Sequence, residues 1–254
     1  MSKKLLWIIF ILVIFGLAVL SSAGIVAGQK KFNSPYYYVF HQLEFGIIPG
    51  LVLMFFFSKI NYKFFRKISF LFLFCVLALM ILVFIPSFGQ GLKGATRWLN
   101  IGPISFQPSE ILKLAIVLYL AAWFGGRKER IKNWAYGMAP FFIIMAFVML
   151  LLVLQPDVGT LIVVMGIAGG IYFFAGISLK QFLGIALMLA AILAFLIAVE
   201  PYRFERIKSF MNPSVDPRGI SYQINQSFVS IGSGGLFGLG YGHSKQKFGF
   251  LPEV

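Results

Sequence analysis

GATRWLNIGPISFQPSEILKLAIVLYLAAWF, residues Gly94–Phe124, joins a polar, glycine-containing segment to an apolar helix. Its second half has the composition of a membrane-spanning helix, yet Glu110 and Lys113 lie within it, three residues apart. Proline is favoured in the first turn of a helix, where its missing N–H has no partner to lose, so Pro108 predicts the helix start. A carboxylate in that turn is favoured by the helix dipole. We therefore expect both charges at the polar end of a membrane helix.

The rest of the chain repeats this apolar character. The 254 residues are 59% hydrophobic, and the mean hydropathy is +0.89. A helix needs about 20 apolar residues to cross a bilayer. Seven such segments run Leu5–Ala27, Phe40–Ser58, Ile68–Ile85, Pro108–Phe124, Ala135–Leu154, Val158–Gly176 and Phe182–Val199. The sequence predicts an all-α polytopic membrane protein, a single domain in which residues 1–199 form a seven-helix bundle and residues 200–254 an external loop.

The distribution of charge predicts the orientation of these helices. The net charge is +14, and the basic residues are concentrated in alternate loops. With a cytoplasmic N-terminus, eleven basic residues face the cytoplasm and four lie in the short outer loops, which is the bias of the positive-inside rule. Topology and anionic lipid account for the basic balance, so nucleic-acid binding is not indicated.

A second helix start has the same pattern as the first. LQPDVGT, residues 154–160, again places glutamine and proline before an acid, Asp157, at the expected outer end of a span. Two such starts predict a polar cavity open to the outer leaflet, because ionisable residues inside a membrane usually mark a functional site. A purely structural interpretation stays open, in which Glu110 is a first-turn acid paired with a Lys113 that reaches up to it.

Two further segments allow a structural and a functional interpretation. The segment around Arg97 and Trp98 is either an interfacial loop with an aromatic anchor or a surface that touches an amphiphilic ligand bearing phosphate. The glycine run 232–242 matches no nucleotide-binding template, and its structural interpretation is a tight or flexible loop. Upstream of it, Ile224, Phe228 and Ile231 have helical spacing, which predicts an interfacial or re-entrant helix over residues 222–231.

The residues leave two classes of function open. One is a membrane enzyme that acts on a lipid-linked substrate in the outer leaflet, and the other is a transporter or flippase. His41 and His243 have no metal-ligand spacing. Nothing indicates a bound cofactor, and a divalent cation is left open.

Three stretches carry a resemblance to a known family. GATRWLNIGPISFQPSEILKLAIVLYLA, LLVLQPDVGT and SFMNPSVDPRGISYQINQSFVSIGSGGLFGLGYGHSKQKFGFLPE together resemble the SEDS family (shape, elongation, division and sporulation), in which FtsW-type and RodA-type branches are distinguished. The pattern of the last stretch looks closer to the division-type FtsW branch. The likeness extends over the whole chain.

The resemblance implies a multi-pass protein of the bacterial cytoplasmic membrane, with ten spans in the family. It implies a peptidoglycan glycosyltransferase that polymerises lipid II at the outer face of that membrane, during division or elongation, beside a class B penicillin-binding protein and the division or elongation machinery. A lipid II flippase is the alternative. By position, the resemblance assigns Arg97, Trp98, Gln107, Ser109, Glu110, Lys113 and Asp157 to a functional cavity, and offers Arg218, Gln223, Gln226, Lys245 and Lys247 as external-loop candidates.

The resemblance also carries an expectation about catalysis. A carboxylate could act as general base, and cations such as Arg97, Lys113, Lys245 or Lys247 could offset charge on a departing diphosphate. In the family an essential aspartate follows the "LPE" motif, which here is residues 251–253. The catalytic residue is therefore expected beyond Val254, and the chain is expected to be a truncated member that is inactive by itself.

Overall fold

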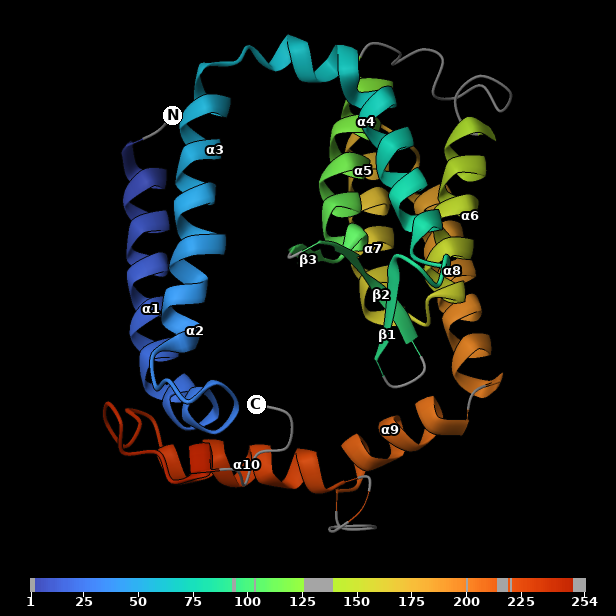
Figure 1. The fold of residues 1–254 in the computed structure, drawn as a ribbon. Coiled ribbons are helices and arrows are strands. Elements are labelled where there is room, and N and C mark those ends of the chain that lie inside the picture. The colour runs from blue at the N-terminus through green and yellow to red at the C-terminus, as the bar shows by residue number, and fades with distance from the viewer. Residues whose placement is uncertain are drawn as a thin grey trace. The chain divides into compact units, whose positions relative to one another are not determined.

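A computed structural model describes residues 3–92, 95–102, 104–125, 139–199, 201–213, 219 and 221–248 (Figure 1). Helices account for most of these residues, and each predicted apolar segment contains one. The chain divides into two compact units, residues 61–192 and residues 1–60 with 193–254. Helix α8, Leu179–Val199, runs from the first of these units into the second.

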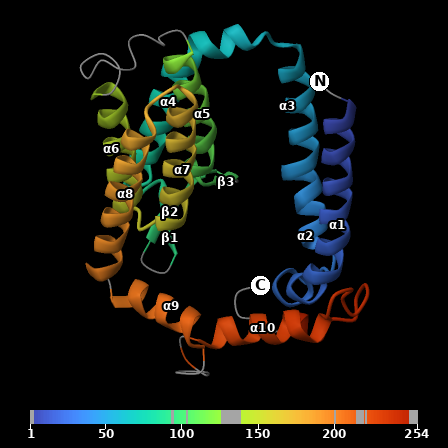
Figure 2. The ribbon, with the colours of Figure 1, turned by 180° about the vertical axis from the view of Figure 1, so that it is seen from behind.

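The unit formed by residues 61–192 is a helix bundle with α5, Pro108–Phe124, at its centre. This helix packs against both α4, Tyr62–Leu82, and α7, Val158–Phe174, while α6, Ala139–Leu154, packs against α7 (Figure 1; Figure 2 from behind). Leu112, Ile116 and Leu120 are fully buried. Because residues four apart share one face of a helix, they form the buried stripe of α5.

A small sheet lies directly before α5. Its strands are β1, Gly89–Leu92, β2, Ala95–Ile101, and β3, Ile104–Phe106, paired antiparallel in that order. Leu99 pairs with Gly89 on one side and Phe106 on the other, and it is fully buried. This sheet was not predicted, because its strands are short and rich in glycine, which weakens the period-two pattern that identifies strands.

The unit formed by residues 1–60 and 193–254 is built on the long helix α1, Lys3–Phe32. After a turn, α2 (Tyr37–Gln42), η1 (Leu43–Ile47) and α3 (Ile48–Lys59) form one continuous helical segment that returns beside α1. Gly28, near the C-terminal end of α1, faces this turn, and a Cβ added to it would be 2.6 Å from the carbonyl oxygen of Ser34. A side chain there would collide with the backbone, so glycine allows this close approach.

The same unit contains the C-terminal helices. They are α9, Pro201–Met211, α10, Tyr222–Gly234, and the 3-10 turn η3, Gln246–Phe248. The helix predicted over residues 222–231 is confirmed as α10, whereas α9 was not predicted.

Length and surface identify the class of protein. Within the described residues, α1, Tyr37–Lys59, α4 and α8 are long and apolar enough to span a membrane, and α6 and α7 are shorter apolar helices. On α1, Trp7 is 70% exposed and Phe15 67%, which suits lipid rather than water. The polytopic α-helical membrane class is confirmed, while the count of seven spans and their orientation stay predictions.

Candidate functional site

The site is built around the carboxylate of Asp157, which begins α7. Asp157 is the N-cap of that helix, and its Oδ1 accepts a hydrogen bond of 3.3 Å from the backbone N–H of Thr160. An aspartate is favoured at this position because it satisfies an N–H that has no partner within the helix. The side chain is only 6% exposed, so its second oxygen requires a donor as well.

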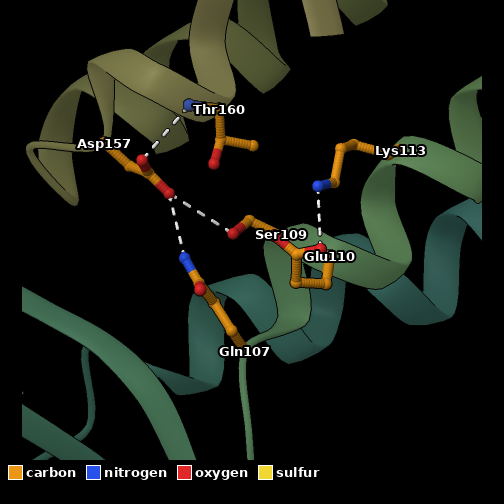
Figure 3. A network of polar contacts seen from close by, with 6 residues as sticks. All are labelled: Gln107, Ser109, Glu110, Lys113, Asp157 and Thr160. Carbon is orange, nitrogen blue, oxygen red and sulfur yellow. Dashed lines mark hydrogen bonds and ion pairs between the residues drawn. The ribbon is translucent and has the colours of Figure 1, made fainter. Parts of the chain in front are cut away.

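The start of α5 supplies donors to that second oxygen. Gln107 Nε2 lies 3.0 Å and Ser109 Oγ 3.4 Å from Asp157 Oδ2 (Figure 3). Gln107 is the N-cap residue of α5, and Ser109 follows Pro108 in its first turn. One carboxylate thus joins the N-termini of α5 and α7, the two glutamine–proline–acid helix starts. That these starts line a polar cavity open to the outer leaflet stays a prediction.

Glu110 and Lys113 form an ion pair within α5. Lys113 Nζ lies 2.8 Å from Glu110 Oε2, and the two side chains are 30% and 58% exposed, respectively (Figure 3). This is the pairing that the structural interpretation predicted. An exposed pair of this kind contributes less than about 1 kcal/mol, so either group can exchange its partner for a ligand at little cost. The pairing is therefore compatible with both interpretations.

Arg97 holds the turn that precedes Asp157. Its Nε donates to the carbonyl oxygen of Gln155 at 3.1 Å, and its Nη2 donates to the carbonyl oxygen of Pro156. The amide of Gln155 in turn donates to the carbonyl oxygen of Met80 on α4 at 3.0 Å, and Gln155 is 1% exposed. Arg97 thus links strand β2 to the α6–α7 turn, and Gln155 links that turn to α4.

Gln155 was not among the predicted site residues. A signal for it exists in the sequence, because a glutamine within an apolar run must find a hydrogen-bond partner when it is buried.

Trp98 follows Arg97 on β2 and is 39% exposed. Successive side chains of a strand point to opposite faces, so Trp98 faces away from the turn that Arg97 holds. Its indole presents an aromatic surface close in sequence to the polar helix starts.

The external-loop candidates belong to the other unit. Gln223 and Gln226 lie on α10, and Lys245 and Lys247 lie at η3, while Arg218 is outside the described residues. Among the residues that the structure describes, no three His, Cys, Asp or Glu side chains cluster as metal ligands.

Comparison with known proteins gives the family. The model of the FtsW/RodA/SpoVE cell cycle proteins matches residues 3–254. The chain is 34% identical over 253 residues to the probable peptidoglycan glycosyltransferase FtsW of Legionella pneumophila, covering 100% of this chain and 64% of that protein. It is 36% identical over 254 residues to the stage V sporulation protein E of Bacillus subtilis, covering 99% and 69%. The chain therefore spans about two thirds of the length of these curated relatives.

A solved structure agrees with this relationship. The chain matches a structure reported for the coordination of polymerization and crosslinking by a peptidoglycan synthase complex. The TM-score is 0.61 and the identity 28%, over 87% of this chain and 66% of that one. The relatives named FtsW support the FtsW-like assignment made from the C-terminal motif. The apolar helices and the match over nearly every residue lead to one conclusion: the chain belongs to the FtsW/RodA/SpoVE family, whose members are multi-pass proteins of the cytoplasmic membrane.

Proposed function

We propose that this chain carries the polar site of a peptidoglycan glycosyltransferase that polymerises lipid II at the outer face of the cytoplasmic membrane. The observation that carries the proposal is the joining of two helix N-termini through Asp157, beside the Glu110–Lys113 pair. Helix N-termini favour anions, and the substrate's diphosphate is an anion at the membrane surface. The names of the FtsW relatives support the same activity.

The contacts divide the polar residues into two roles. Asp157 is buried and already accepts hydrogen bonds from Gln107, Ser109 and the N–H of Thr160, so it positions the two helix starts. Glu110 and Lys113 are more exposed and are held only by each other in the contacts described, so they meet the substrate.

The chemistry assigns a task to the exposed lysine. Polymerisation requires a sugar hydroxyl to attack an anomeric carbon from which a diphosphate departs. Negative charge accumulates on the bridging oxygen, and an ammonium group placed there lowers the barrier. Lys113 leaves Glu110 and donates to the departing diphosphate, which frees the Glu110 carboxylate to accept the proton of the attacking hydroxyl as the glycosidic bond forms.

We further propose that the protein works beside a transpeptidase of the class B penicillin-binding type. Support comes from the related solved structure, a peptidoglycan synthase complex reported to coordinate polymerization and crosslinking. The expected result is longer or more abundant glycan chains when this partner is added.

The test measures glycan ladders made from labelled lipid II in liposomes. The chain is assayed as it is, and also joined to the C-terminal third of the Legionella relative, each with and without the partner. Ladders that disappear with Lys113→Gln but persist with Lys180→Gln, an exposed lysine of α8, support the proposal. Ladders that persist with Lys113→Gln contradict the role of Lys113. Transfer of lipid II across the bilayer without ladders from any form contradicts the polymerase and supports the flippase.

A further inference from the structure

A cavity of about 580 Å³ lies between the middle of α1 and the glycine-rich segment that follows α10. Both walls belong to the unit of residues 1–60 and 193–254, and η3 contacts α1 directly. Figure 1 shows this C-terminal segment, in red, beside the α1–α2 end of the unit. The wall on α1 consists of Phe15, Ala18, Val19, Ser22 and Ala23. Small residues at three of these positions make room for the cavity.

Hydrogen bonds hold the glycine-rich segment against α1. Ser21 Oγ and Tyr241 OH are 2.6 Å apart, and the backbone N–H of Gly242 donates to Ser22 Oγ at 3.1 Å. Gly238, Gly240 and Gly242 all have positive φ angles, of 75°, 91° and 79°. Only glycine adopts such angles without strain, which gives the glycine run a role in shaping this wall.

One cation lines the cavity. Lys247 is half-buried, and its Nζ donates to the carbonyl oxygen of Gly242 at 2.5 Å. An ammonium has three donors, and no carboxylate among the described residues lies within ion-pair distance of it. The remaining lining residues are apolar or uncharged.

The apolar surroundings of this cation make its charge costly. Helix α1 has 30 residues and is apolar along its length. At 1.5 Å per residue, residues 15–23 run from its middle towards its C-terminal end. A positive charge beside the apolar part of a membrane helix is costly unless an anion compensates it, and the carbonyl oxygen of Gly242 accepts from only one of the three ammonium donors. A ligand with both an apolar chain and an anionic group would fill the apolar part of the cavity and compensate the charge of Lys247.

We propose that this cavity binds an anionic phospholipid of the surrounding bilayer, with one acyl chain along Phe15–Ala23 and the phosphate at Lys247. The charge selects this ligand, because a single lining cation matches a phosphodiester with a single negative charge. A prenyl diphosphate carries more charge than one lysine compensates. The inference does not depend on the roles proposed for Glu110, Lys113 and Asp157, and it is tested without turnover.

The test uses photoreactive lipids. The protein is reconstituted in phosphatidylcholine vesicles with a trace of either phosphatidylglycerol or phosphatidylcholine carrying a diazirine on the acyl chain. Cross-linked peptides are then identified by mass spectrometry. The phosphatidylglycerol probe is expected to label residues 15–23 and 237–247 roughly fivefold more than the phosphatidylcholine probe, the effect of one lysine near a membrane surface.

Variants separate the cavity from the general lipid surface. Ala18→Trp fills the cavity and is expected to abolish this labelling, whereas Ile14→Trp, at a 64% exposed position outside the lining, is expected to leave it unchanged. Lys247→Gln is expected to remove the preference between the two probes, and Lys247→Arg to keep it. The lysine variants add no bulk, so they test the proposal even where Ala18→Trp fails to fold.

Three results would overturn the proposal. They are equal labelling by the two probes in the unmodified protein, labelling spread evenly along α1, and displacement of the phosphatidylglycerol probe by a prenyl diphosphate at equal or lower concentration. The last result would assign the cavity to that lipid class instead.

Discussion

Asp157 caps α7 and also accepts hydrogen bonds from the start of α5. Its substitution should therefore destabilise both helix starts. In Asp157→Ala, the donors on Gln107, Ser109 and Thr160 lose their acceptor in a buried place. Loss of an N-cap costs about 0.5–2 kcal/mol, and each buried donor left unpaired costs about 1–3 kcal/mol. We expect the free energy of unfolding to fall by at least about 2 kcal/mol, measured by thermal unfolding in detergent.

Two other variants act as controls for Asp157→Ala. Asp157→Asn keeps an N-cap acceptor and is expected to lose less stability than the alanine variant. Asn61→Ala removes the N-cap of α4, whose side chain accepts one exposed hydrogen bond from the N–H of Lys63. A larger fall in the free energy of unfolding for Asn61→Ala than for Asp157→Ala would contradict the role of Asp157 as an acceptor shared by α5 and α7.

Arg97 is predicted to act through its geometry rather than through its charge alone. The guanidinium donates through two nitrogens to successive carbonyl groups, and the ammonium of a lysine cannot reproduce this fork. Arg97→Lys is therefore expected to lower the free energy of unfolding by about 1 kcal/mol, the typical net value of one hydrogen bond. Arg66→Lys on the exposed surface of α4 is the matched control. Equal unfolding temperatures for the two variants would contradict a stabilising role for the two hydrogen bonds of Arg97.

At the scale of the element, the turn after α1 depends on one glycine. In Gly28→Ala the new Cβ would meet the carbonyl oxygen of Ser34 at 2.6 Å, so the backbone of the α1–α2 turn must move. Overpacking of this kind costs about 1–3 kcal/mol. Gly16→Ala in the same helix meets nothing within 4 Å and should be neutral or stabilising by up to about 1 kcal/mol. Comparing the two unfolding temperatures tests the prediction, and similar shifts would show that the close approach is not needed.

The long apolar helices were predictable because length and composition alone identify a membrane helix. The boundaries of α5 were predicted residue by residue, since Pro108 fixes its start. The sheet and α9 were not predicted: β2 pairs with residues outside its own segment, and a short amphipathic helix such as α9 lacks the length that identifies a span.

The candidate site was predictable only in part, for a related reason. Asp157 could be placed at a helix start from the sequence, whereas its donors could not be named, because Gln107 and Ser109 are 50 and 48 residues away. The same applies to the link between Arg97 and the carbonyl groups of Gln155 and Pro156, which depends on tertiary packing rather than on local pattern.

At the scale of the whole molecule, the bias of basic residues predicts a cytoplasmic N-terminus. The chain has one cysteine, Cys75, so a Cys75→Ser background allows single cysteines to report the orientation. In spheroplasts, a membrane-impermeant maleimide is expected to label Ser233→Cys, at an exposed position on α10, and to leave Lys63→Cys, at the exposed start of α4, unlabelled until the membrane is opened. The reverse pattern would invert the predicted topology.

The shared carboxylate of Asp157 also has a consequence for biosynthesis. The ribosome delivers α5 to the membrane before α7, and Asp157 is made 50 residues after Gln107. During that interval the amide of Gln107 and the hydroxyl of Ser109 lack the acceptor that Asp157 provides in the folded protein. Insertion of α7 brings Asp157 to this place. The hydrogen bonds at the start of α5 therefore form only once the later helix has been inserted correctly.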